Sequence, residues 1–187
     1  MKNNKVPDED FGRFIYEKIN VITDIQLLIL KGHVLIEYSL NKFIKDCSEI
    51  DDKELDEFTF YKKIKLAKML GLFWKLKKDN LEKKVLDINR LRNQIAHDLS
   101  YDKKLIEKLI GYYLDDSDFS HLIKIENSEL ENLHHVIPSI CGDIIGRKLG
   151  KQKISCFTKI FLTQERMKNP TDFDTKFNDF KSLLKLK

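Results

Sequence analysis

The chain of 187 residues carries 42% hydrophobic and 34% charged residues, a balance typical of a soluble globular protein with one sizeable core. It has only seven glycines and three prolines, and this shortage of turn-forming residues favours an all-helical bundle over a sandwich or a barrel. The net charge of +4 is compatible with a polyanionic partner but does not require one.

Cysteine usage and the amino terminus bear on where the protein works. The three cysteines, Cys47, Cys141 and Cys156, are widely spaced and odd in number, which favours a reducing compartment over a disulfide framework. Residues 1–10 lack the apolar run of a signal peptide, and no segment reaches the length of an uninterrupted transmembrane helix. We therefore expect a cytoplasmic protein with no membrane partner.

Apolar residues recur at helical spacing from Asp8 to about Cys47, which predicts one long helix or two in tandem. The central part, from Leu27 to Glu37, is apolar nearly all round and is expected to lie between the core and a partner. Gly32 in this stretch costs about 1 kcal/mol relative to alanine in a helix interior, and close approach of another helix would explain it.

His33 and Glu37 lie four residues apart and therefore share a face of this helix. Two polar groups on a largely apolar surface need hydrogen-bond partners. One interpretation is structural, with the histidine and the carboxylate satisfying each other. The other is that both residues border a functional cleft.

Hydrophobic periodicity, helix-capping residues and helix-breaking residues divide the rest of the chain into a loop and further helices. The acidic stretch from Ser48 to Glu57 is expected to be a solvated loop. The helices predicted after it run from Phe60 to Gly71, from Asp79 to about His97, from a cap at Ser100 or Asp102 through Tyr113, and from about Ser128 to Lys151 with Pro138 inside.

The last segment, beyond Pro170, repeats phenylalanine and leucine every three or four positions, which predicts an amphipathic helix that docks on the body or on another chain. We assign residues 8–165 to an antiparallel helical bundle and residues 166–187 to a C-terminal helical tail. The predicted fold class is all-α.

The stretch from Leu91 to Asp98 contains the residues best suited to chemistry, namely Arg92, Asn93 and His97. Arginine supplies a planar, permanently charged fork for phosphate, asparagine a donor and an acceptor, and histidine a group that exchanges a proton near neutral pH. On a helix Asn93 and His97 share a face, whereas Arg92 and His97 diverge by about 140°. These groups suit phosphodiester cleavage. In the structural alternative, Arg92 and Asn93 are solvated helix residues and His97 is favoured by the helix dipole.

Signatures of other enzyme classes are missing from the sequence. It shows no phosphate-cradling glycine loop, Walker-type lysine, dinucleotide fingerprint, zinc spacing or nucleophile elbow. His134, His135 and Cys141 do not form a metal pattern, because adjacent histidines point about 100° apart on a helix and no second ligand cluster accompanies them. We expect neither a cofactor nor a metal.

The Arg-Asn-x-x-x-His pattern of Arg92, Asn93 and His97, on the third helix of a small helical domain, resembles the HEPN superfamily. Many of its members are metal-independent RNases of toxin–antitoxin, phage-defence and CRISPR-associated systems. They bring two such motifs together across a two-fold axis, so the resemblance implies a homodimer with Arg92, Asn93 and His97 as catalytic residues. We expect His33 and Glu37 to support this site, with Glu37 orienting the Arg92 guanidinium.

The segment from Phe60 to Leu72 resembles the corresponding helix of mannitol-operon-repressor-like proteins, which implies a non-catalytic regulatory or scaffolding protein as the alternative. The motif is degraded in that repressor family and intact here, which favours catalysis. We therefore expect a metal-independent endoribonuclease, a toxin or phage-defence effector, that cleaves RNA by attack of the ribose 2′-hydroxyl. Its partners would be RNA, a second copy of the chain and an antitoxin or other regulatory protein.

Overall fold

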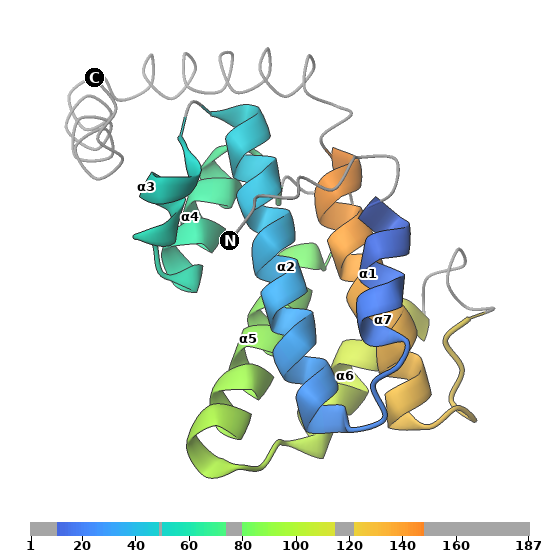
Figure 1. The fold of residues 1–187 in the computed structure, drawn as a ribbon. Helices are drawn as coiled ribbons and strands as arrows, with labels where there is room; N and C mark the ends of the chain where they lie inside the picture. Colours follow the sequence, from blue (N-terminus) through green and yellow to red (C-terminus); the bar gives the residue numbers. More distant parts are fainter. Residues whose placement is uncertain (1–10, 49, 74–79, 115–121, 148–187) are drawn as a thin grey trace, which may run out of the picture. The chain divides into compact units, whose positions relative to one another are not determined.

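The computed structural model describes residues 11–48, 50–73, 80–114 and 122–147, and these form helices joined by short connections, with no strand in those ranges (Figure 1). The all-α prediction is confirmed. The helices are α1 (Phe11–Ile19), α2 (Ile25–Cys47), α3 (Asp52–Asp56), α4 (Phe60–Met69), α5 (Leu81–Asp98), α6 (Lys103–Leu114) and α7 (Glu129–Gly146).

The described residues belong to one compact unit. The predicted boundary after residue 165, the C-terminal helical tail over residues 166–187 and the last residues of the predicted 128–151 helix lie outside the described part and stay predictions. None of the helices in the described ranges combines the length and the apolar character needed to cross a bilayer.

The long apolar stretch near the amino terminus forms two helices, α1 and α2, so the tandem alternative is confirmed. The chain breaks between them because the Asp24 side chain accepts a hydrogen bond from the backbone N–H of Leu27 at 2.7 Å and so caps α2. α2 is the central helix and packs against α1, α4, α5 and α7 (Figure 1). Its buried side chains include Leu28, Ile36 and Phe43, each about 1.5–3 kcal/mol of hydrophobic stabilisation.

Gly32 lies where α2 meets α7. A Cβ atom built on Gly32 would lie 2.6 Å from the Cδ1 of Ile137 and 3.1 Å from its Cγ1 and Cγ2. These distances are shorter than van der Waals contact, so a side chain at position 32 would have to push the Ile137 side chain aside. The close approach predicted for Gly32 is confirmed.

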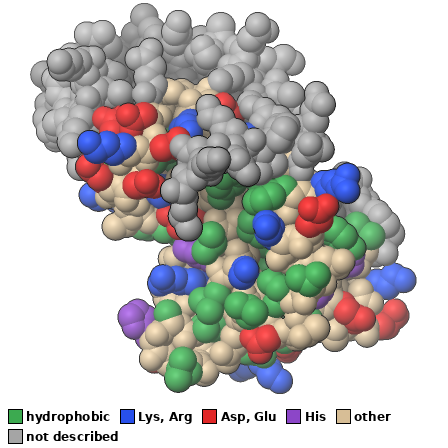
Figure 2. Space-filling model, in the orientation of Figure 1, with side chains coloured by type: hydrophobic (Ala, Val, Ile, Leu, Met, Phe, Trp, Pro, Cys, Tyr) green, Lys and Arg blue, Asp and Glu red, His purple; other side chains and the backbone are tan. Residues whose placement is uncertain are grey.

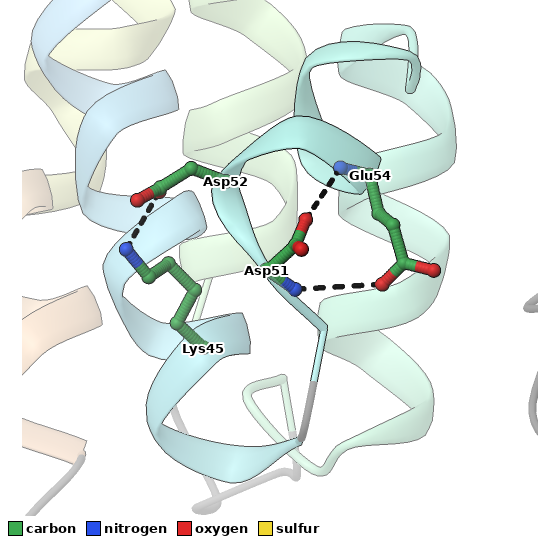
Figure 3. Close-up of polar contacts among 4 residues, drawn as sticks. All are labelled: Lys45, Asp51, Asp52 and Glu54. Atoms are coloured by element: carbon green, nitrogen blue, oxygen red, sulfur yellow. Dashed lines mark hydrogen bonds and ion pairs between the residues drawn. The ribbon is translucent and has the colours of Figure 1, made fainter.

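The expectation of a solvated loop from Ser48 to Glu57 is wrong, because this stretch contains α3. Asp51 and Glu54 form a capping box, in which each side chain bonds the other residue's backbone N–H (Figure 3). Lys45 at the end of α2 contacts Asp52 at 2.6 Å, and Leu55 is fully buried. The Asp-x-x-Glu spacing of Asp51 and Glu54 indicates this helix, but the neighbouring acidic residues make the pattern hard to recognise in the sequence.

The other helix ends follow from local chemistry. Thr59 and Ser128 cap α4 and α7 through their hydroxyl groups. Gly71 lies just after α4 and has a φ of 90°. Leu99 caps the end of α5, and its φ of 51° is left-handed although leucine carries a side chain. The Gln26 amide donates to the carbonyl oxygen of Leu99 at 3.1 Å, so the start of α2 lies beside the end of α5 and the two helices run antiparallel.

Candidate functional site

α5 positions the predicted motif at the edge of the bundle. One side of the helix is buried against α2, α6 and α7, through residues that include Ile88, Leu91 and Ile95. Beside this apolar side, Arg92 is half-buried, and Asn93 and His97 are exposed. The structure therefore places all three motif residues on one accessible stretch of α5.

Arg92 and Asn93 are in direct contact. The guanidinium Nη1 of Arg92 donates to the Oδ1 of Asn93 at 3.0 Å. His97 lies one helical turn beyond Asn93 and has no hydrogen-bond partner within the described ranges. The structure thus joins two of the three predicted catalytic residues and leaves the third open to solvent.

The two arginines of α5 differ in their surroundings. Arg90 forms an ion pair with Asp87, with 2.9 Å between the guanidinium nitrogen and the carboxylate oxygen. The Asp87 side chain is only 1% exposed, and it also accepts bonds from Lys108 and Tyr112. Arg92 has no carboxylate within ion-pair distance in the part of the chain that the structure describes. Its guanidinium keeps its charge and several donors available, which is what binding of an anion requires.

His33 is buried on α2, with 6% of its surface exposed. Its Nε2 lies 3.1 Å from the Oδ1 of Asn89 on α5, and its ring packs on Phe60 of α4 at 4.2 Å between centroids. Burial lowers the pKa of His33, and the charges of Arg92 and Lys63 lower it further, against the raising effects of Asn89 and Glu37. The imidazole is therefore neutral near pH 7, within the electrostatic reach of Arg92.

Glu37 pairs with Lys63 of α4, with 2.6 Å between carboxylate oxygen and ammonium nitrogen. The Lys63 side chain is 4% exposed and that of Glu37 31% exposed. The expectation that Glu37 binds and orients Arg92 is wrong, and so is the alternative in which His33 and Glu37 satisfy each other by a direct bond. Each residue instead finds a partner on a neighbouring helix, which spacing along α2 cannot reveal.

Sequence reasoning missed two residues here, Asn89 and Lys63. Asn89 precedes Asn93 by four residues, so the helical spacing that linked Asn93 to His97 also placed Asn89 on that face. Nothing in the sequence marked Lys63 as a buried cation, because lysine is usually exposed.

Apolar side chains are exposed next to the motif. Leu27 and Val34 on α2 are 45% and 64% exposed, and Leu99 at the end of α5 is 80% exposed. We call these three residues the apolar surface. In the space-filling view, hydrophobic side chains gather over the face formed by α1 and α2 (Figure 2). Leu99 follows His97 by two residues, and the Gln26 side chain next to Leu27 bonds the Leu99 carbonyl oxygen, so the start of α2 lies beside the end of the motif.

The residues first considered as metal ligands have other surroundings. Burial raises the pKa of the Cys141 thiol to about 12, so it does not supply a thiolate at neutral pH. The Nε2 of His134 lies 2.9 Å from the carbonyl oxygen of Ile22. Within the described ranges, no three histidine, cysteine or acidic residues converge as a metal site would need.

Comparisons of the chain with family models, curated proteins and solved structures found no match. The HEPN resemblance therefore rests on the sequence motif of Arg92, Asn93 and His97 alone.

Proposed function

We propose that the protein is a metal-independent endoribonuclease of the HEPN type, acting in the cytoplasm as a toxin or phage-defence effector. The observation that supports this most is the surface of α5, where an arginine without a carboxylate partner among the described residues lies beside Asn93 and one turn from an exposed histidine. An anion-binding fork next to an imidazole, which can act as an acid or a base, suits phosphodiester chemistry.

The reaction needs a nucleophile, and the ribose 2′-hydroxyl of the substrate supplies it. Its oxygen attacks the adjacent phosphorus, the bond to the 5′-oxygen breaks, and a 2′,3′-cyclic phosphate remains. His97 takes the hydroxyl proton or donates one to the leaving oxygen, a contribution of typically 10²–10⁴-fold. Arg92 neutralises charge on the non-bridging oxygens, and Asn93 donates to the same phosphate.

A second copy of the chain is the partner that this chemistry favours. Leu99 of the apolar surface follows His97 by two residues, and burying the exposed leucine and valine side chains of this surface between two copies would be favourable. A two-fold interface there brings two His97 side chains toward one substrate, so one acts as base and the other as acid. An antitoxin or another regulatory protein would block cleavage by covering this same region.

The test is degradation of total RNA by the purified protein in a chelator. We expect 2′,3′-cyclic or 3′-phosphate ends, no cleavage at 2′-deoxy positions, and loss of activity in His97→Ala and Arg92→Ala. Arg13→Ala, which removes an exposed arginine of α1, is the matched control and keeps full activity. A magnesium requirement, cleavage of a 2′-deoxy substrate, or activity in His97→Ala would exclude this mechanism.

One observation favours a non-catalytic HEPN-like regulatory or scaffolding protein instead. His97 has no partner in the described ranges to orient its ring, whereas catalytic histidines are usually held by a hydrogen bond. In that case RNA stays intact in the assay, and the protein acts through the apolar surface by binding another protein.

A further inference from the structure

Asn89, Asn93 and His97 follow one another every four residues on α5. Their side chains therefore form a row along one face of the helix, with a rise of about 6 Å at each step. That step is comparable to the separation of neighbouring phosphates in an extended nucleic acid strand. Arg92 lies between the two asparagines in the sequence and has no carboxylate partner among the described residues.

The two asparagine side chains of this row are engaged in the same way. The Oδ1 of Asn89 contacts the Nε2 of His33 at 3.1 Å, and the Oδ1 of Asn93 accepts from Arg92 at 3.0 Å. In both amides the carbonyl oxygen bonds to another side chain of the same protein. The Nδ2 groups have no hydrogen-bond partner in the part of the chain that the structure describes. Each amide therefore presents N–H donors to a ligand, which is the polarity that an anion requires.

The orientation of Asn89 is held by a buried neighbour. His33 is 6% exposed and packs against the Phe60 ring, so its position is fixed by the core. With the proton on Nε2, the imidazole donates to the Asn89 oxygen. Rotating the amide by half a turn would place two donors together and leave the buried N–H unpaired. In this tautomer the Asn89 donors are pre-oriented before a ligand arrives.

We propose that Asn89 is a substrate-binding residue, whose Nδ2 donates to the phosphate that neighbours the one held by Arg92 and Asn93 on a single RNA strand. This assignment rests on the proposed function and deepens it, because it names extended single-stranded RNA as the substrate class. The bound strand follows α5, with the scissile phosphate near Arg92 and His97 and the next phosphate toward the amino-terminal end of the helix. His33 is a positioning residue that acts through Asn89.

Asn89→Asp separates binding from a merely structural role. The aspartate keeps an oxygen acceptor for His33 and replaces the donor nitrogen by a second, negatively charged oxygen. If Asn89 only supports His33, the change acts on RNA through its added charge alone, and the amide signals of Asn89 in the wild type do not shift when RNA binds. If Asn89 holds a phosphate, the change removes a donor and adds repulsion. Asn80→Asp adds the same charge at the amino-terminal cap of the same helix, about 25 Å from His97 along the axis.

The measurement is fluorescence anisotropy with a labelled 12-nucleotide RNA in which every 2′-hydroxyl is methylated, so that binding occurs without cleavage. We expect Asn89→Asp to weaken the Kd roughly tenfold, as Arg92→Ala does, while Asn80→Asp stays within about twofold of the wild type. In the wild type, the side-chain amide signals of Asn89 should shift in 1H–15N spectra on addition of this RNA, a result that does not depend on the folding of any variant.

The outcomes distinguish this inference from the proposed function. Unchanged binding by folded Asn89→Asp, or unshifted Asn89 amide signals, with a weakened Arg92→Ala, overturns the role of Asn89 and leaves the ribonuclease proposal standing. A wild type that neither binds this RNA nor cleaves the unmodified strand overturns both.

Discussion

At the scale of single residues, burial decides which polar groups remain available to a ligand. His33 and Arg92 lie close enough for the charge of one to act on the other, yet His33 is enclosed by Phe60 and Asn89 while Arg92 reaches the surface. Desolvation disfavours the charged imidazole, so the single permanent positive charge of this pair belongs to Arg92. The proposed site therefore has a fixed cation, Arg92, beside neutral amide donors.

The lowered pKa of His33 makes stability depend on pH. Its ordinary pKa is 6.5, and the folded protein binds the proton less readily than the unfolded chain. The contribution of His33 is therefore fully present above pH 6.5 and is lost as the pH falls below this value and through the folded pKa. We expect the free energy of unfolding of His33→Gln to depend less on pH than that of the wild type, measured by urea unfolding between pH 7.5 and 5. Parallel profiles for the two proteins would contradict it.

Replacing Glu37 and replacing Lys63 should lower the free energy of unfolding by different amounts, although the two residues form one ion pair. Glu37→Gln leaves a buried ammonium without a counter-charge, which costs about 3 kcal/mol. Lys63→Met fills the same space with an apolar chain and leaves a carboxylate that is 31% exposed to water, so it should cost less. Chemical denaturation of the two variants checks this order. Equal losses would mean that water reaches Lys63 as readily as Glu37.

At the scale of elements, the approach of α2 to α7 sets the packing beneath the site. Gly32→Ala would gain helix propensity but would push a methyl group into Ile137, and such overpacking costs typically 1–3 kcal/mol. Gly111→Ala in α6 is the matched control, since nothing lies within 4 Å of its added Cβ. We expect a lower Tm for the first variant and a higher Tm for the second. A stable Gly32→Ala would show that Ile137 moves aside at little cost.

The end of α5 holds a leucine in a conformation that suits glycine. Leu99 has a φ of 51° and is 80% exposed, so Leu99→Gly removes left-handed strain of roughly 1–2 kcal/mol without opening a cavity. We expect its Tm to rise. Leu122→Gly, at a position 40% exposed and without positive φ, should bring no such gain. If Leu99 contacts a second copy, Leu99→Gly also weakens self-association, seen by light scattering.

At the scale of the whole molecule, function is expected to depend on assembly. In the proposed dimer, Val34→Asp places a charge on the apolar surface and should give a monomer, measured by light scattering at micromolar concentration. Cleavage of RNA should fall with it, because the two motifs no longer meet. Ile125→Asp, at an 85% exposed position before α7, should change neither. A wild type that is monomeric and active would exclude a site shared between two copies.

The helical class and most helix ends follow from short-range patterns in the sequence. Periodicity placed the apolar sides, and Asp24, Thr59 and Ser128 act locally, through hydrogen bonds to backbone groups three residues away. The shared face of Asn93 and His97 also followed from helix geometry alone. Such features span one or two turns, so neighbouring residues are enough to specify them.

The partners of His33 and Glu37 depend instead on how distant helices pack together. Asn89 is 56 residues from His33 in the chain, and Lys63 is 26 residues from Glu37. Whether they meet depends on how α4 and α5 pack against α2, and a rotation of either helix by one residue, about 100°, would turn these side chains away. The accessibility of Arg92, and the hydrogen bond that leaves the Asn89 donors free, follow from that packing.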